Sequence, residues 1–138
     1  MTMETPDSEM MAPVEAVARF IESGGTSSLT GVFVNGPVTM VENFAPFLFE
    51  GDGAVADWTA RMRDHAVGLT GLVHEFAMAH DFGRVADEAY FSLPTTWRGV
   101  TRGRAFTETG GWSFLLRRQE GAWRVRAYGW AVTGLSFA

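Results

Sequence analysis

Glu42 is the side chain whose type and setting point most directly to acid–base chemistry in this chain of 138 residues. It follows Val41 and comes shortly before Phe44 and Phe47, so its immediate neighbours are apolar. Desolvation raises the pKa of a carboxyl group, which can then accept a proton from a C–H or O–H group near neutral pH. Two interpretations stay open. Glu42 is a general base, or it lies at a cavity mouth or pairs with an arginine and has no part in chemistry.

The amino-acid composition excludes several other mechanisms. The chain has no Cys and no Lys, and all 11 of its basic residues are Arg. This excludes a thiol nucleophile, a disulfide, a Cys-ligated metal, a Lys Schiff base and a Lys-containing phosphate loop. The net charge of −5 argues against nucleic acid as a partner. The side chains that remain suit binding, or proton transfer that requires no cofactor.

The three histidines do not form a metal-binding motif. His74 and His80 would lie about 20 Å apart if they share one strand, which is too far for a common metal ion. His80 precedes Asp81, and the two are either an oriented acid–base pair or the polar end of a hairpin. His65 completes the apolar stripe of a predicted helix, which favours a histidine at the edge of the core. We therefore expect no metal site.

The spacing of apolar residues predicts helices in the first half of the chain. A helix from about residue 12 ends at Gly24-Gly25, and a short second helix follows from Thr26. A third helix is expected over about 53–67. Between the second and third helices, residues 38–49 form a strand that Pro46 interrupts.

The second half of the chain is predicted to be an antiparallel sheet. Aromatic and β-branched residues dominate after Gly71, and turn sequences divide them. Gly110-Gly111 lies where a bulge would bend the sheet. Helices before such a sheet indicate the α+β class, here a cone-shaped α+β barrel with three N-terminal helices against a strongly bent antiparallel sheet. The four long strands expected are 71–82, 85–98, 103–118 and 122–133.

The ends and the domain division follow from composition. Residues 1–11 are predicted to be a flexible N-terminal tail and residues 12–138 a single domain. The start of the chain lacks the basic and apolar runs of a secretion signal, and no stretch is apolar for about 20 residues. We expect a cytoplasmic protein without a membrane partner.

Three segments of this predicted fold resemble the nuclear transport factor 2-like superfamily, and most closely its SnoaL-like and ketosteroid-isomerase-like branch. The resemblance covers about residues 12–134 and implies the cone-shaped fold, but not one function, because this scaffold serves many. The segments are Val41 to Phe47 leading to Gly51 and Trp58, Glu108 to Leu116, and Gly121 to Val125 ending in Tyr128-Gly129-Trp130.

The resemblance to ketosteroid isomerases implies a role for some residues and removes it from others. Glu42, nine residues before Gly51, corresponds to the general-base Asp of these enzymes. Their hydroxyl donor on the first helix corresponds to Phe20, which cannot donate, and their acidic donor corresponds to Ser113, which donates more weakly. Loss of one such donor typically costs on the order of 100-fold in rate, so steroid isomerisation is not expected. The predicted catalytic residues are Glu42, Ser113 and His80.

The ligand-binding residues are predicted from the same resemblance and from strand alternation. Trp130 corresponds to a pocket-facing Trp of the isomerases, and alternation then places Tyr128 and Arg126 on its face. Arg126 inside the cone would need Glu42 or a ligand carboxylate as partner. The predicted ligand-binding residues are Trp58, Tyr90, Arg126, Tyr128 and Trp130, with Ser92 beside Tyr90.

The opposite face of the two last strands is predicted to be a dimer surface. On the third strand of the sheet, Gly111, Ser113 and Leu115 would face the cone. The outward set would then be too apolar for a solvated face, and such a patch marks an interface. Relatives form dimers through this face, so a homodimer is expected through Trp112, Phe114, Trp123 and Val125.

Together these observations predict a SnoaL-like small-molecule-binding protein with an apolar, cone-shaped pocket. Its ligand would be a small apolar or ring-shaped metabolite. One hypothesis adds cofactor-free lyase, isomerase or hydrolase activity that depends on Glu42. The other is a non-catalytic ligand-binding or dimeric interaction domain.

Overall fold

The first helix, α1 (Ser8–Ser23), starts earlier than predicted. In the computed structural model, which describes residues 4–138, the Asp7 side chain accepts a hydrogen bond of 2.9 Å from the Met10 N–H and caps the helix. Residues 8–11, expected in the flexible tail, are therefore helical, and residues 1–3 lie outside the described residues. The predicted end at Gly24 is confirmed, because this residue adopts a φ of 73° that suits glycine.

The helix count of the prediction is wrong. The described chain has two α-helices, α1 and α2 (Ala54–His65), while the predicted second helix is a single turn of 3-10 helix, η1 (Thr26–Leu29). The sequence of η1, Thr-Ser-Ser-Leu, is too short to bury an apolar stripe, so only one tight turn forms. The helix α2 begins after Gly53 without a side-chain cap.

The predicted strand over 38–49 is a hairpin of two short strands. β1 (Val38–Val41) pairs antiparallel with β2 (Leu48–Gly51), and the Ala45–Pro46 peptide bond between them is cis. This hairpin turns the chain directly after β1, where Glu42 lies.

Seven strands form one curved sheet in the order β2-β1-β7-β6-β5-β3, with β4 also paired to β5. The sheet is mixed and not purely antiparallel, because β1 runs parallel to β7. The predicted strand 71–82 is divided in two. The later strands are β3 (Leu69–Phe76), β4 (His80–Val85), β5 (Glu88–Thr101), β6 (Arg104–Gln119) and β7 (Ala122–Phe137).

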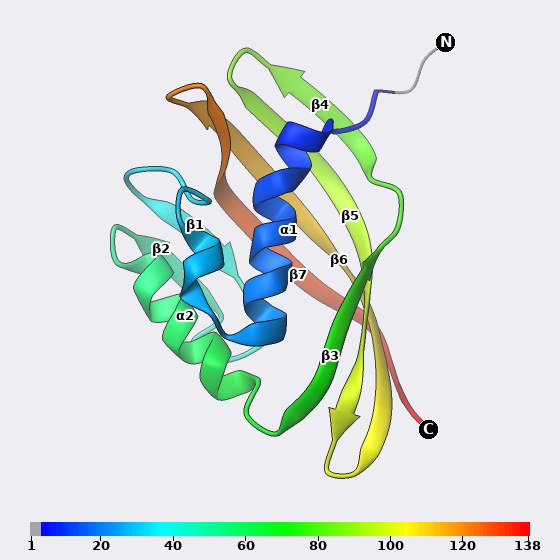
Figure 1. Cartoon of the computed structure of the whole chain (residues 1–138). Helices are drawn as coiled ribbons and strands as arrows, with labels where there is room; N and C mark the ends of the chain where they lie inside the picture. The colour runs from blue at the N-terminus through cyan, green and yellow to red at the C-terminus, as the bar shows by residue number, and fades with distance from the viewer. Residues whose placement is uncertain (1–3) are drawn as a thin grey trace.

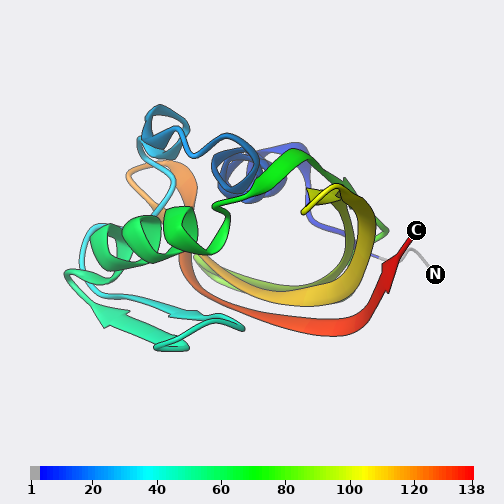
Figure 2. The ribbon, with the colours of Figure 1, turned by 90° about the horizontal axis from the view of Figure 1, so that it is seen from below.

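The sheet bends around the helices and leaves one end of its concave side open to form a site. Figure 1 shows α1 and α2 on the same side of the sheet, and Figure 2 shows β5, β6 and β7 curved into a trough below α1. The parallel contact between β1 and β7 places Met40 opposite Tyr128. Glu42, just beyond β1, is thereby brought beside the middle of β7.

The predicted facing of β6 is wrong. Trp112, Phe114 and Leu116 lie in the core, whereas Ser113 is exposed. Even-numbered residues of β6 therefore face the helices along the strand. The alternating large apolar side chains mark the buried face, and not an outer patch.

The predicted facing of β7 is correct for one half of the strand. Tyr128 is buried and Trp130 partly buried, as expected, but Trp123 and Val125 are buried as well. A bulge explains both observations. Leu116 pairs with Val125 and Leu115 with Ala127, so Arg126 is an extra residue that reverses the alternation.

The proposed dimer surface is corrected by these positions. The residues assigned to it belong to the core of the single chain and cannot form an interface between folded copies. They are Trp112, Phe114, Trp123 and Val125, which are 3%, 0%, 6% and 0% exposed.

Candidate active site

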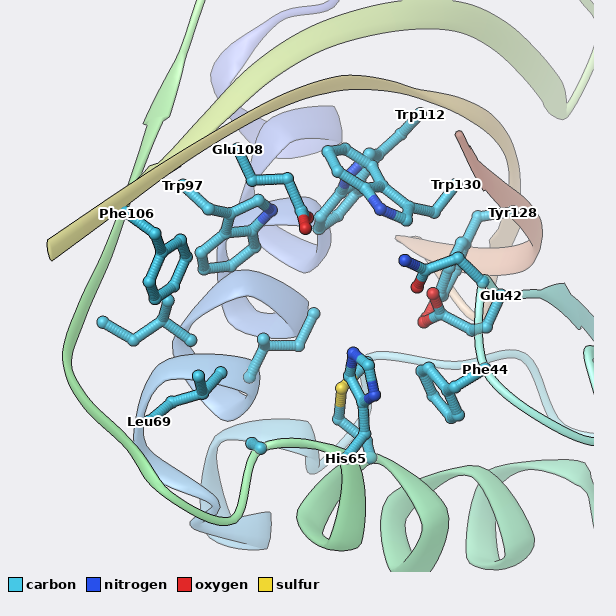
Figure 3. Close-up of a pocket in the computed structure, with 15 residues that line it drawn as sticks. Glu42, Phe44, His65, Leu69, Trp97, Phe106, Glu108, Trp112, Tyr128 and Trp130 are labelled. Carbon is cyan, nitrogen blue, oxygen red and sulfur yellow. The ribbon is translucent and has the colours of Figure 1, made fainter. Parts of the chain in front are cut away.

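A pocket with a cavity volume of about 80 Å³ lies on the concave side of the sheet, beside the end of α2. Its walls come from α1, α2, the segment after β1, and the strands β3, β5, β6 and β7. Figure 3 shows Glu42, Glu108 and His65 directed toward the same space from different sides. The lining residues are Ile21, Glu42, Asn43, Phe44, Met62, His65, Ala66, Leu69, Leu72, Trp97, Phe106, Glu108, Trp112, Tyr128 and Trp130.

The carboxyl group of Glu42 is held by two hydrogen bonds to one oxygen. Its Oε2 accepts from Trp58 Nε1–H at 2.9 Å and from the Tyr128 hydroxyl through a short contact. No hydrogen bond reaches Oε1 from any residue in the described range 4–138. Since Glu42 lines the pocket, Oε1 is the oxygen available to a bound molecule.

Burial changes the acidity of Glu42. The residue is 5% exposed, and loss of hydration raises its pKa from 4.5 to about 7. The hydrogen bonds from Tyr128 and Trp58 oppose this rise because they stabilise the ionised form, and the charge of Glu108 adds to it. Glu42 is therefore poised to take up and release a proton near neutral pH.

The two donors to Glu42 are rigidly placed by the core. Trp58, on the buried face of α2, packs against Phe20 of α1 at a ring-centroid distance of 5.0 Å and against Phe33 at 5.7 Å. Tyr128 stacks on Trp112 at 5.7 Å. Burial, together with the neighbouring Glu42 charge, raises the pKa of Tyr128 well above its ordinary value, so its hydroxyl remains a donor.

Glu108 is a second carboxyl group in the pocket. It comes from β6 on the same face as Trp112, and it has no ion pair or hydrogen bond from its side chain within residues 4–138. Partial burial raises its pKa above the ordinary value. The pocket thus holds two carboxyl groups of weakened acidity.

His65, in the last turn of α2, stands at the pocket edge. Its ring stacks on Phe44 with centroids 4.5 Å apart and planes inclined by 19°. Partial burial lowers the pKa of His65, which favours the neutral imidazole. The prediction of a core-edge histidine describes its position, but the residue also lines the pocket.

Trp112 contributes an unpaired donor to the wall. Its Nε1–H is buried and has no acceptor among the residues that the structure describes. A buried polar group without a partner is uncommon in folded proteins. The indole packs at right angles to Trp130, with centroids 5.6 Å apart.

Three of the predicted site residues line this pocket, and a fourth contacts one of them from behind. Glu42, Tyr128 and Trp130 line the pocket. Trp58 is fully buried behind Glu42 and reaches it through the indole N–H. Its position is that of a residue that orients the carboxyl group, and not of a wall.

The other four predicted site residues lie outside the pocket. Arg126 does not face Glu42, because the bulge turns it outward to an ion pair with Glu88 at 2.8 Å. The Tyr90 hydroxyl lies 3.4 Å from Ser113 Oγ on the outer face of the sheet, where Tyr90 is exposed.

His80 is exposed on β4 and pairs across the sheet with Ser92, also away from the pocket. His74 lies on a different strand, β3, and binds Glu22 of α1 at 2.8 Å. Among the described residues, no three His, Cys, Asp or Glu side chains are grouped to hold a metal ion.

Sequence reasoning missed Glu108, Trp97 and Phe106 as pocket residues. A signal was present, because even-numbered residues of β6 run from Phe106 through Glu108 to Trp112 at strand spacing. An inward Trp112 therefore implies an inward Glu108. Trp97 belongs to the matching alternation on β5, where it pairs with Glu108.

Comparison with known proteins identifies the fold. No protein-family profile matches the sequence, and no curated protein is similar to it in sequence. A hexachlorocyclohexane dehydrochlorinase (LinA type 2) superposes with a TM-score of 0.78 at 7% identity, covering 95% of this chain and 87% of that chain. A scytalone dehydratase candidate from Novosphingobium aromaticivorans gives 0.72 at 13% identity, with coverages of 93% and 86%.

A nuclear transport factor 2-like superfamily protein from Salmonella enterica superposes with a TM-score of 0.72 at 13% identity, covering 91% of this chain and 89% of that chain. The chain thus has the α+β fold of the nuclear transport factor 2-like superfamily, as its sequence segments indicated. Dehydrochlorinase and dehydratase enzymes share this fold.

Proposed function

We propose that this protein binds a small, largely apolar or ring-shaped metabolite in the pocket and that Glu42 acts on it as a general base without a cofactor. The observation that carries the proposal is the buried Glu42 carboxyl group, fixed through Oε2 and open to the pocket through Oε1. Its pKa of about 7 lets the ionised form be present at neutral pH while its basicity exceeds that of an ordinary carboxylate.

The reaction class follows from what the base can reach. A carboxylate in an apolar pocket can remove a proton from a C–H or O–H group, which begins an elimination or an isomerisation. The structurally similar dehydrochlorinase and the scytalone dehydratase candidate are named for eliminations. This supports a lyase-type reaction in the SnoaL-like and ketosteroid-isomerase-like branch of the superfamily.

A second candidate function is ligand binding without catalysis. It is favoured by the two positions where isomerases carry donors, since Phe20 is a buried hydrocarbon and Ser113 lies on the outer face. In that case Glu42 serves as a hydrogen-bond acceptor for Trp58 and Tyr128 and for a ligand.

Exchange of the α-hydrogens of cyclopentanone for deuterium in heavy water distinguishes the two functions. Glu42 would take the α-hydrogen as a proton, leave the enolate, and return a deuteron after exchange with solvent. We expect exchange about 100-fold faster with the wild-type protein than with Glu42→Gln. The rate should rise with pH through about 7, because only the ionised carboxylate accepts the proton.

The matched control is Glu50→Gln, an exposed residue of β2 close to Glu42 in sequence. This variant should exchange cyclopentanone at the wild-type rate. Equal exchange by the wild-type and Glu42→Gln proteins would remove Glu42 as a base and leave binding alone.

Two further parts of the proposal concern assembly and location. The homodimer expected from the sequence remains part of the proposal, but its interface does not consist of the core residues first assigned to it. Light scattering at micromolar protein concentration tests whether the protein is a dimer. None of the helices in residues 4–138 has the length and apolar character needed to cross a membrane. A cytoplasmic location is part of the proposal.

A further inference from the structure

The pocket has an unbalanced set of charges. Glu42 and Glu108 are its acidic residues, and none of its described lining residues is Arg. His65 and Tyr128 are the other titratable lining groups. Lowered basicity keeps His65 neutral near pH 7, and Tyr128 holds its proton. No positive side chain in the lining therefore compensates the two carboxyl groups.

Glu108 differs from two other acidic residues of the sheet, which have basic partners. Glu88 binds Arg117 and Arg126, and Glu75 lies 3.6 Å from Arg98. Glu108 has no such contact among the described residues, although it is partly buried in an apolar wall. A carboxylate in this position gains most from a cation that enters the pocket.

The rest of the wall also suits a cation. Faces of aromatic rings carry negative partial charge and attract ammonium groups within about 6 Å. Rings come from the three strands β5, β6 and β7 and from the segment after β1, so they surround the space on several sides (Figure 3). The aromatic lining residues are Phe44, Trp97, Phe106, Trp112, Tyr128 and Trp130.

The hydrogen bonding of the wall also leaves a place for a donor. Glu42 is 5% exposed, and its Oε1 atom has no hydrogen bond from the described chain. Because Glu42 lines the pocket, a bound molecule that carries a polar hydrogen can supply the missing donor.

We propose that the ligand of this pocket is a small protonated amine, whose ammonium group lies against Glu108 and the aromatic rings. Its hydrocarbon part packs on the apolar wall within reach of Glu42. This inference rests on the proposed function of the pocket and names the charge of the molecule that enters it. It excludes carboxylate ligands, because the lining offers them two like charges and no arginine.

Three probes of similar shape and different charge test the inference. Cyclopentylamine, cyclopentanol and cyclopentanecarboxylate are titrated into the protein at about pH 8, where the amine is protonated. Binding is followed by calorimetry and by the fluorescence of the pocket tryptophans. We expect the amine to bind about tenfold more tightly than the alcohol and the carboxylate not to bind. An alcohol that binds as tightly as the amine would overturn the inference.

Glu108→Gln removes the charge with little change of shape. This variant should bind the amine about tenfold more weakly than the wild type and the alcohol equally well. Glu75→Gln, an exposed carboxyl on β3, is the matched control and should leave both affinities unchanged. Unchanged amine affinity in Glu108→Gln refutes the role of Glu108. The comparison of the three probes uses the wild-type protein alone, so it tests the charge of the ligand even if the variant does not fold.

The outcomes separate this inference from the proposed function. Binding of cyclopentanol in preference to cyclopentylamine overturns the amine and leaves the pocket and the base intact. Failure of all three probes to bind also overturns the amine, while cyclopentanone exchange judges Glu42 independently. Preferred amine binding without cyclopentanone exchange supports the amine and removes the base.

Discussion

The pH dependence of stability tests directly whether Glu42 is buried as the structure shows. A carboxyl group whose pKa is 4.5 when the chain is unfolded and about 7 when it is folded binds its proton more tightly in the folded state. Stability from this group is present below pH 4.5 and is lost as the pH rises through 7. The shift from 4.5 to about 7 corresponds to about 3 kcal/mol of unfolding free energy.

The perturbation is Glu42→Gln, which removes the ionisation and keeps an oxygen that can accept from Trp58 and Tyr128. Urea denaturation is followed by circular dichroism at intervals from about pH 4 to about pH 8. We expect the unfolding free energy of the variant, minus that of the wild type, to rise by about 3 kcal/mol over this range. Other titrating groups are present in both proteins, so the difference isolates Glu42.

Glu50→Gln is the control for a general effect of removing one charge, because Glu50 is exposed. Its stability should follow the wild-type pH curve. If the difference between Glu42→Gln and the wild type stays constant within about 0.5 kcal/mol across the range, Glu42 is not desolvated and the reasoning fails.

Three further predictions concern the surroundings of Glu42. Tyr128→Phe removes a hydrogen bond that lowers the pKa of Glu42, so the midpoint of the pH–rate profile for cyclopentanone exchange should move upward; a downward move would contradict the assigned hydrogen bond. Phe114→Ala should lower the unfolding free energy by about 3–5 kcal/mol in urea denaturation, because the ring is fully buried; a loss below about 1 kcal/mol would mean that β6 faces the other way. Gly110→Ala should weaken cyclopentylamine binding and lower the melting temperature, because its Cβ would clash with the Ala131 carbonyl oxygen and come within 2.6 Å of the Trp130 ring; unchanged values would contradict this close approach of β6 and β7.

The parts of the fold that were predictable depend on local signals. The end of α1 at Gly24 follows from two adjacent glycines, and the order of helices and strands follows from the change of apolar period. Glu42 was predictable for a related reason. A single carboxyl group between apolar residues has few stable environments. Both interpretations of Glu42, as a general base or as a group without chemistry, therefore place it in a cavity, at a cavity mouth or beside an arginine.

The facing of strands was harder to predict because it depends on single-residue irregularities. Correspondence with the isomerases places Ser113 inward, which forces Trp112 and Phe114 outward. Their size was the better guide, since large apolar side chains at alternate positions normally mark the buried face of a strand. Counting back from Tyr128 places Arg126 inward, and nothing in the sequence marks Arg126 as the extra residue of a bulge.

The short elements were mispredicted because their structure comes from tertiary contacts. The chain between β3 and β4 leaves strand geometry at Ala77 to Ala79, although both strands pair with β5. The Ala77 N–H instead bonds to the Pro94 carbonyl at 2.9 Å. A sequence pattern that reads as one strand cannot reveal such a break.

The bulge at Arg126 gives the two halves of β7 opposite phase along a single strand. Before it, the odd-numbered Trp123 and Val125 enter the core, and after it the even-numbered Tyr128 and Trp130 enter the pocket. If Arg126 instead paired in continuous register, without a bulge, the whole strand would have one phase and one of the two pairs would turn to solvent. The bulge is therefore what lets a single strand contribute both to the core at one end and to the pocket at the other.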